Sequence, residues 1–373
     1  MLQAYQKLKL ELLDFMNQPS STDEAFNEMA LKVFTFQYEH NQAFRKFCRK
    51  RRVSPRTIKH YSEIPPVPID AFKLTTLSCH PIEETEAVFM TSGTTNADRR
   101  GKNYHRDLEI YDRSMKTHFK PYIMPDVEKL KMYVLFPTQE EMPNSSLAHY
   151  LHIAKETFGT KDSQYAFSSE GFKLDELIEE LTKVEKQKEP VLLIGATFSF
   201  IHLVDECKQR GIQFKLPANS RVMDTGGAKG RSREMTPNAF KKEMAALFSI
   251  PREMCVNMYG MTELSSQFYD GNINDKHQKN PISETKRAPH WMKTMVIDIE
   301  TMKEKPKGEQ GILVHYDLAN LNSVMAILTE DVGIAEGEGF HLLGRASGAE
   351  AKGCSLAVEQ FLASTEMQKG ESL

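Results

Sequence analysis

Two glycine-containing segments each follow a short apolar run and carry residue types that bind phosphate or nucleotide. The first is Thr91-Ser92-Gly93-Thr94-Thr95. Its backbone N–H groups and hydroxyls can close around phosphate oxygens, although no Gly-Lys-Ser/Thr follows as in a Walker A loop. The second is Asp224-Thr225-Gly226-Gly227-Ala228-Lys229-Gly230. Its adjacent glycines let a flat ligand lie against the backbone. Taken singly, each segment is also compatible with an ordinary turn, which is the commoner role of a Ser/Thr/Gly loop such as the first.

Two further segments add an aromatic ring and carboxylates. One is Tyr259-Gly260-Met261-Thr262-Glu263, and the other is Thr329-Glu330-Asp331-Val332-Gly333, followed by Gly344-Arg345. The ring of Tyr259 can stack on a purine, and Glu263 is suited to holding Mg²⁺ between phosphate oxygens. An Asp at a strand end, such as Asp331, can accept both ribose hydroxyls, and a nearby Arg345 suits a phosphate. The ordinary alternatives are a buried tyrosine, a solvated glutamate and a solvated acidic turn.

Short apolar runs alternate with amphipathic segments and must position these motifs. The candidate strands are Ala87–Met90, Met132–Phe136, Val191–Ile194, Arg221–Thr225, Cys255–Tyr259, Met295–Ile299 and Gly311–His315. The candidate helices are Asp175–Gln187, Ser199–Arg210 and Pro237–Phe248. This alternation predicts α/β layers with a substantially parallel sheet. We expect a helical N-terminal region (1–80), an α/β nucleotide-binding core (81–290), a small β-rich subdomain (291–345) and a short C-terminal segment (346–373).

The N-terminal region shows helical spacing of apolar residues after a possible N-cap at Ser21-Thr22-Asp23. It ends in a basic run, Arg45 to Arg52. That run is either a docking patch for an acidic partner or nucleotide tail, or a solvated helix end whose cations suit the helix dipole.

Composition limits the class of protein. The chain has 373 residues, 48 Lys+Arg against 51 Asp+Glu, a net charge of −3 and 40% hydrophobic residues, as in globular proteins of two or three folding units. Without a Lys/Arg excess, no nucleic-acid partner is expected. The five cysteines form no CxxC pair, which fits a reducing cytoplasm better than a disulfide framework. We expect a cytoplasmic protein with neither a signal peptide nor a membrane span, because the most apolar run (191–204) is too short.

The order and spacing of the four motifs resemble the acyl-adenylate-forming enzyme superfamily, and Gly308-Glu309-Gln310-Gly311 is similar to its Gly-Glu-x-Gly turn. The resemblance implies an adenylate-forming large domain in which a carboxylic acid attacks the α-phosphorus of ATP, with Mg²⁺, giving acyl-AMP and pyrophosphate. It implies phosphate contacts from Thr91–Thr95, purine contacts from Gly226, Gly227 and Tyr259, and a ribose contact from Asp331. Glu263 is then the Mg²⁺ ligand.

The C-terminal end narrows the resemblance. Superfamily members normally continue past Gly-Arg with a mobile domain of about a hundred residues that carries a catalytic lysine. Here residues 346–373 remain, and they include Lys352-Gly353-Cys354-Ser355-Leu356. This truncated tail, and the Pro-rich segment 64–68 followed by Phe72-Lys73, are similar to the acyl-protein synthetases of bacterial bioluminescence fatty-acid reductases. That family implies a fatty acid substrate, Cys354 as thioester acceptor, and an acyl-CoA reductase-type protein partner that reduces the acyl group with NADPH.

Some positions depart from the superfamily pattern. The phosphate loop continues through 96–102 without the usual glycine and prompt lysine, and Glu330 stands where a glycine usually precedes the ribose-binding Asp. The absent mobile-domain lysine leaves Lys229 as a substitute for stabilising developing negative charge, or else as a surface lysine at a helix start.

A thioester acceptor must become a thiolate, since a free thiol with a pKa of about 8.5 is only a few per cent ionised at neutral pH. We expect Lys352, and a helix starting after Gly353, to lower the pKa of Cys354. We also expect Gly353 to leave room for the acyl group. Three other cysteines, Cys79, Cys207 and Cys255, are expected to be packing residues.

These observations predict an enzyme that activates a fatty acid as acyl-AMP and transfers it to Cys354. Two alternatives stay open. One is a free-standing ligase that passes the acyl group to coenzyme A or a carrier protein. The other is a nucleotide-binding scaffold that organises a reductase complex through Arg45–Arg52.

Overall fold

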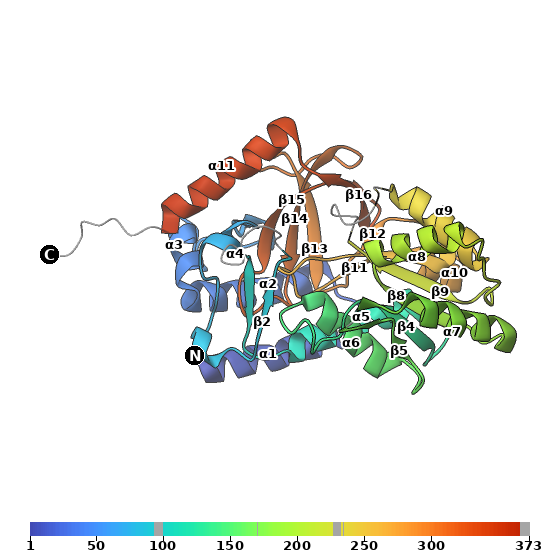
Figure 1. Ribbon diagram of the computed structural model, residues 1–373. Coiled ribbons are helices and arrows are strands. Elements are labelled where there is room, and N and C mark those ends of the chain that lie inside the picture. The colour runs from blue at the N-terminus through green and yellow to red at the C-terminus, as the bar shows by residue number, and fades with distance from the viewer. Residues whose placement is uncertain (93–99, 170, 227–232, 234, 366–373) are drawn as a thin grey trace. The chain divides into compact units, whose positions relative to one another are not determined.

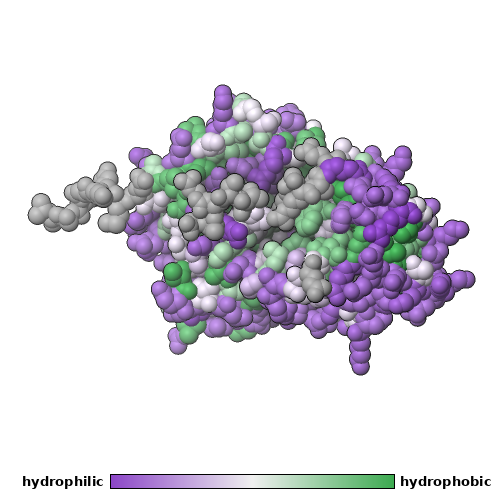
Figure 2. Space-filling model, in the orientation of Figure 1, coloured by the Kyte–Doolittle hydropathy of each residue, from purple (hydrophilic) through white to green (hydrophobic). Residues whose placement is uncertain are grey.

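A computed structural model of the chain describes residues 1–92, 100–169, 171–226, 233 and 235–365. Two compact units are present (Figure 1). Unit 1 comprises Met1–Ser114, Met261–Ser266 and Ala288–Leu373, and unit 2 comprises Met115–Gly260 and Gln267–Arg287. Polar and charged side chains cover much of the face seen in Figure 2, with smaller hydrophobic patches among them.

Unit 1 begins with three helices, α1 (Leu2–Met16), α2 (Asp23–His40) and α3 (Gln42–Lys50). The predicted N-cap is confirmed, because the Ala25 backbone N–H donates to Thr22 Oγ1 at 3.2 Å. Short elements follow: the 3₁₀ turns η1 (Tyr61–Glu63) and η2 (Ile82–Glu84), strand β1 (Val67–Pro68) and helix α4 (Ala71–Leu74). The hairpin of β2 (Ala87–Met90) and β3 (Lys102–His105) then flanks the candidate phosphate loop.

The rest of unit 1 is an antiparallel sheet. Its strands are β13 (Met292–Ile297), β14 (Gln310–Asp317), β15 (Ala326–Glu336) and β16 (Gly339–Arg345). Strand β1 pairs in parallel with Ile327 and Leu328 of β15. Strand β14 pairs with one edge of β15. Strands β1 and β16 both pair with the other edge, β1 at Ile327 and Leu328 and β16 from Asp331 onward.

The solvated acidic turn, the ordinary alternative for residues 329–331, is wrong, because these residues form a bulge inside β15. Leu328 opposes Val314 and Val332 opposes Ile312, so three residues of β15 face Leu313 alone. Thr329 Oγ1 donates to the Leu313 carbonyl at 2.8 Å. Pairing with β14 resumes beyond the bulge, which keeps the strand continuous. The bulge lies on β15 between the end of β1 and the end of β16.

Unit 2 is an α/β layer whose sheet has the order β12-β11-β10-β9-β8-β4-β5. The parallel strands are β4 (Lys131–Leu135), β5 (Gln164–Tyr165), β8 (Val191–Ala196), β9 (Arg221–Thr225) and β10 (Cys255–Tyr259). Strands β11 (Phe268–Asp270) and β12 (Lys286–Arg287) run antiparallel to their neighbours. A small hairpin joins β6 (Phe167–Ser168) to β7 (Gly171–Phe172). The predicted α/β fold and largely parallel sheet are confirmed.

The helices of unit 2 are α6 (Ser146–Phe158), α7 (Leu174–Gln187), α8 (Thr197–Gln209), α9 (Pro237–Phe248) and α10 (Asn272–Gln278), with 3₁₀ turn η4 (Arg252–Met254). Helix α5 (Glu109–Ile123) passes from unit 1 into unit 2. Strand β8 is buried along its whole length, as its continuous apolar run predicts. Within the described ranges, no helix combines the length and apolarity needed to cross a membrane.

Helix α11 (Gly348–Thr365) ends the described part of unit 1 and packs against α3, α4, β1 and β15 (Figure 1). Its last turn is bound by the basic run of α3. Lys50 Nζ donates to the Ala363 carbonyl at 3.0 Å, and the rings of Phe47 and Phe361 lie 4.7 Å apart. The cations of this run therefore stabilise the carboxyl end of another helix of the same chain.

Candidate active site

Candidate nucleotide-binding residues of unit 2 lie at the carboxyl edge of its parallel sheet. Strand β9 leads into Gly226, whose φ of 80° is a left-handed conformation that glycine adopts freely. Strand β10 leads into Gly260, and β8 leads into Thr197. Thr197 Oγ1 lies 3.0 Å from the Gly226 carbonyl. This is the edge at which open α/β sheets bind ligands. Tyr259 is buried beside Phe268, with ring centroids 5.5 Å apart. Gly227 and Lys229 lie outside the described residues.

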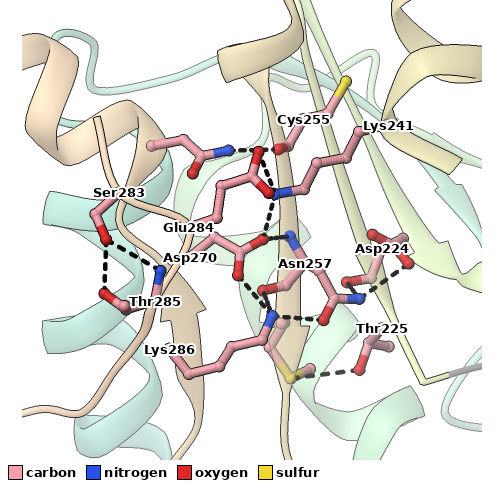
Figure 3. A network of polar contacts seen from close by, with 12 residues as sticks. Asp224, Thr225, Lys241, Cys255, Asn257, Asp270, Ser283, Glu284, Thr285 and Lys286 are labelled. Atoms are coloured by element: carbon pink, nitrogen blue, oxygen red, sulfur yellow. Dashed lines mark hydrogen bonds and ion pairs between the residues drawn. The ribbon is translucent and has the colours of Figure 1, made fainter. Parts of the chain in front are cut away.

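A buried network of charges supports this edge (Figure 3). Asp270 lies between Lys241 Nζ at 2.8 Å and Lys286 Nζ at 2.7 Å. Burial alone would raise the pKa of Asp270, but the two lysines lower it below its ordinary value. Asn257 Nδ2 donates to Asp224 Oδ2 at 3.0 Å, and burial raises the pKa of Asp224 to about 6. The network holds β9, β10 and β11 together through paired and hydrogen-bonded charges.

In unit 1 the base of the candidate phosphate loop meets Glu263 and Lys73. The Thr91 N–H donates to the Gly101 carbonyl, and the Gly101 N–H donates to Thr91 Oγ1, each at 3.0 Å. A Cβ on Gly101 would lie 3.1 Å from Thr91 Cγ2, 3.2 Å from Glu263 Oε1 and 3.5 Å from Lys73 Cγ. Three side chains thus converge on the glycine. Of the other candidate loop residues, Ser92 follows Thr91 directly, whereas Gly93, Thr94 and Thr95 lie outside the described residues.

Thr262 and Glu263 are fixed through their backbone carbonyls. Asn103 Nδ2 donates to the Thr262 carbonyl at 3.1 Å, and Asn320 Nδ2 donates to the Glu263 carbonyl at 2.8 Å. The fully buried Gln37 of α2 in turn donates through Nε2 to the Asn320 carbonyl at 2.9 Å. The N-terminal helices therefore help to position the segment that carries Glu263.

The Glu263 side chain is almost completely buried, with the residue 4% exposed. Burial raises the pKa of its carboxyl to about 7, against the opposing effects of its own backbone N–H and the positive charges of Lys73 and Arg345. Both cations are bound to other carboxylates. Lys73 Nζ lies 2.6 Å from Asp70 Oδ1, and Arg345 Nε lies 3.2 Å from Asp331 Oδ1. Glu263 is thus a buried carboxylate whose charge is only partly compensated.

Cys354 lies in α11, buried over the β15 bulge, with Sγ 3.8 Å from the Thr329 carbonyl. It faces a pocket too tight for a water molecule, which is lined by Pro68, Ile69, Leu328, Thr329, Glu330 and Val358. Burial raises the pKa of the thiol to about 11, and the nearby charges of Glu330 and Glu350 add to this. The predicted lowering of the pKa of Cys354 is therefore wrong for this conformation, in which burial and neighbouring acidic groups raise it.

Two related predictions about this helix are also wrong. Helix α11 begins at Gly348, where φ is +59°, and not after Gly353, so its amino terminus does not point at the thiol. Gly353 does not leave a free space, because a Cβ there would lie 2.7 Å from Ile299 Cγ1. Its lack of a side chain lets α11 pack closely on Ile299, two residues beyond the end of β13.

Sequence reasoning missed several residues that build the site. Asp70, which binds Lys73, carries a detectable signal, because an acid and a base three residues apart follow the Pro-rich segment. Asn103 and Asn320 carry no such signal, since each acts through a backbone carbonyl brought near only by the fold.

Comparison with solved structures identifies the class of fold. 2-Hydroxyisobutyryl-CoA ligase, solved in the postadenylation state in complex with R3-HIB-AMP, superposes with a TM-score of 0.64. The alignment is 14% identical and covers 90% of this chain and 72% of the ligase. An open conformation of the same ligase, in complex with 2-HIB-AMP and CoA, gives a TM-score of 0.63 at 15% identity, over 87% of this chain and 74% of the ligase. The fold is that of the adenylate-forming enzymes, which confirms the predicted fold class.

Sequence comparison then gives the family. The family model described as "Acyl-protein synthetase, LuxE" matches residues 12–363, so the chain belongs to the acyl-protein synthetase family. A long-chain-fatty-acid–luciferin-component ligase of Aliivibrio fischeri is 22% identical over 95% of this chain and 94% of its own length. The ligase of the same name from Vibrio harveyi is 20% identical over 88% and 85%. The resemblance inferred from the motifs is confirmed.

Proposed function

We propose that this protein activates a long-chain fatty acid with ATP, takes the acyl group onto Cys354 as a thioester, and delivers it to an acyl-CoA reductase-type partner. The observation that carries the proposal is the arrangement in unit 1. Thr91 and Glu263 converge at Gly101, while Asp331 and the carbonyl nearest Cys354 Sγ belong to one bulge of β15. The candidate ribose ligand of the first half-reaction and the backbone beside the thiol of the second therefore belong to the same strand, β15. The five unpaired cysteines fit action in the cytoplasm.

In the first half-reaction, a carboxylate oxygen of the fatty acid attacks the α-phosphorus of ATP. The bond from that phosphorus to the oxygen bridging to the β-phosphate breaks, so pyrophosphate leaves and acyl-AMP forms. We assign phosphate contacts to Thr91, Ser92, Gly93, Thr94, Thr95, Thr262 and Arg345, purine contacts to Gly226, Gly227, Tyr259 and Gly260, and the ribose contact to Asp331. Lys229 is a further candidate for stabilising the negative charge that develops.

Glu263 is the residue that would hold Mg²⁺. The metal prefers carboxylate oxygens combined with substrate phosphates, and a buried, partly compensated carboxylate beside the phosphate loop matches that preference. When bound, the metal supplies positive charge that offsets the charge of the phosphate oxygens.

In the second half-reaction, Cys354 Sγ loses its proton to solvent and attacks the acyl carbonyl carbon. The bond from that carbon to the phosphate oxygen breaks, and AMP leaves. Since the thiol is buried and burial raises its pKa to about 11, α11 has to shift before Sγ becomes reactive. The shift is local, because α11 is a single helix that follows β16 after two residues.

The proposal is tested by intact-mass spectrometry after incubation with ATP, Mg²⁺ and fatty acids of several chain lengths. We expect an added acyl mass that hydroxylamine removes and that Cys354→Ala abolishes. The matched control is Cys207→Ala, another buried cysteine, which keeps the adduct. An adduct that persists in Cys354→Ala contradicts the thioester assignment.

The burial of Cys354 favours one other function, a ligase that passes the acyl group from AMP to coenzyme A or a carrier protein. In that case Cys354→Ala still releases acyl-CoA or loads the carrier at the wild-type rate. Under our proposal, Cys354→Ala loses both the acyl adduct and the transfer of the acyl group to an acceptor.

A further inference from the structure

Lys73 lies in α4, directly after the segment of unit 1 that lines the Cys354 pocket. Strand β1 is held in the sheet by its pairing with β15, and the Ile69 N–H donates to the Leu328 carbonyl at 2.9 Å. Pro68 and Ile69 line the pocket that Cys354 faces, and α4 begins two residues later. The backbone that carries Lys73 is therefore fixed beside the acceptor thiol.

The side chain of Lys73 reaches the other end of the site. Its Cγ lies 3.5 Å from the Cβ position of Gly101, at the base of the phosphate loop, where Glu263 Oε1 also lies. It is also 41% exposed, so a bound substrate can reach it. Its ion pair with Asp70 at 2.6 Å uses one of the three donors of the ammonium group, which leaves two for other oxygens.

We propose that Lys73 is a catalytic residue that contacts the oxygens of the reacting carboxyl and α-phosphate. This inference rests on the proposed function. It assigns to Lys73 the stabilisation of developing negative charge, the role for which Lys229 is the other candidate. In adenylation the ammonium group stabilises the negative charge on the α-phosphate oxygens as the carboxylate oxygen bonds to the phosphorus and pyrophosphate departs. In thioester formation it stabilises the oxyanion on the acyl carbon as Sγ bonds and AMP departs. The lysine keeps its proton in both steps, and Asp70 positions it.

The test compares four variants with the full-length wild-type protein. Lys73→Met removes the charge, Lys73→Arg keeps it, and Asp70→Asn releases the lysine without removing it. Lys32→Met serves as the control. It removes another exposed lysine, whose Nζ lies 2.7 Å from Glu11 Oε2 and which is not part of the site. The measurements are fatty-acid-dependent ATP–pyrophosphate exchange, with kcat and KM for ATP separated, and acyl-adduct formation by intact mass.

We expect Lys73→Met to lower kcat for exchange by about 100-fold with little change in KM for ATP, as for the loss of one transition-state donor. Lys73→Arg should recover about a tenth of the wild-type rate, and Asp70→Asn should lose less than Lys73→Met. A structural role for the ion pair predicts equal losses in Lys73→Met and Asp70→Asn, which would overturn the inference, as would wild-type kcat in Lys73→Met. Absence of exchange in the wild type would instead refute the proposed function.

Discussion

Two buried carboxylates show how differently the two units use charge. Asp270 in unit 2 and Glu263 in unit 1 are 2% and 4% exposed. Asp270 is enclosed by two buried lysines at 2.8 and 2.7 Å and has a lowered pKa. The cations near Glu263 are bound to Asp70 and Asp331, and its pKa rises to about 7. Compensated charge fixes a fold, whereas partly compensated charge remains available to a ligand.

The largest expected effect breaks the compensated cluster. Asp270→Asn leaves Lys241 and Lys286 buried without their shared counter-charge, so we expect the free energy of unfolding to fall by about 3–5 kcal/mol. Denaturant titration followed by circular dichroism measures the change. Glu11→Gln, at the exposed pair with Lys32, is the control and should change stability by less than about 1 kcal/mol. Equal effects of the two variants would remove the distinction between the clusters.

The pH dependence of stability tests the partly compensated carboxylate. A carboxyl whose pKa is raised from 4.5 to about 7 on folding favours the folded state fully below pH 4.5, and this contribution is lost as pH rises to 7. The Glu263→Gln variant does not lose this contribution, because its amide side chain does not titrate. Over that range we expect the variant to gain about 3 kcal/mol of stability relative to the wild type, measured by unfolding titrations without nucleotide or metal. A constant difference between the two proteins would contradict the raised pKa.

Activity should respond in the opposite sense to stability. Because Glu263 is proposed to hold Mg²⁺, we expect Glu263→Gln to slow ATP–pyrophosphate exchange by about 100-fold, equivalent to about 2.7 kcal/mol. Asp270→Asn, assayed at a temperature where it stays folded, should keep its rate within about threefold of wild type. An exchange rate unaffected by Glu263→Gln would show that the carboxylate is structural.

The smallest effect concerns the outer cation of unit 1. The Arg345 side chain is 66% exposed, so solvent screens its pairing with Asp331. We expect Arg345→Gln to change the free energy of unfolding by less than about 1 kcal/mol, measured by the same titration. It should also shift the pH range in which Glu263 titrates slightly upward, because the positive charge of Arg345 favours the ionised carboxylate and is lost in the variant. A loss of several kcal/mol would mean that this cluster is as tightly coupled as that of Asp270.

Local sequence patterns predicted the bounds of helices and strands correctly where neighbouring residues determine them. Strands Ala87–Met90, Arg221–Thr225 and Cys255–Tyr259 have the predicted bounds, because each is a short apolar run that glycine or polar residues terminate. Helix Pro237–Phe248 also has its predicted bounds, with proline in its first turn and Thr236 as its N-cap.

The predictions are wrong where contacts between residues distant in the sequence determine the structure. Thr329–Asp331 is polar enough to be a turn, yet pairing with β14 on both sides makes it a bulge. Gly353 is a plausible helix start, but contact with Ile299 explains it better, and that residue is distant in sequence. The convergence of Lys73 and Glu263 on Gly101 depends on the same long-range packing, and no periodicity or spacing encodes it.

The side chain of Gln37 has a consequence for how this chain can be shortened or recombined. Its Nε2 donates to the Asn320 carbonyl, and its Oε1 accepts from the Met325 N–H at 2.9 Å. Asn320 in turn holds the backbone at Glu263. The first helices are thus not a detachable leader in front of a nucleotide-binding module. A shortened chain that began at β2 would leave the turn at 320–325 without the hydrogen bonds from Gln37, and the backbone at Glu263 would lose that support.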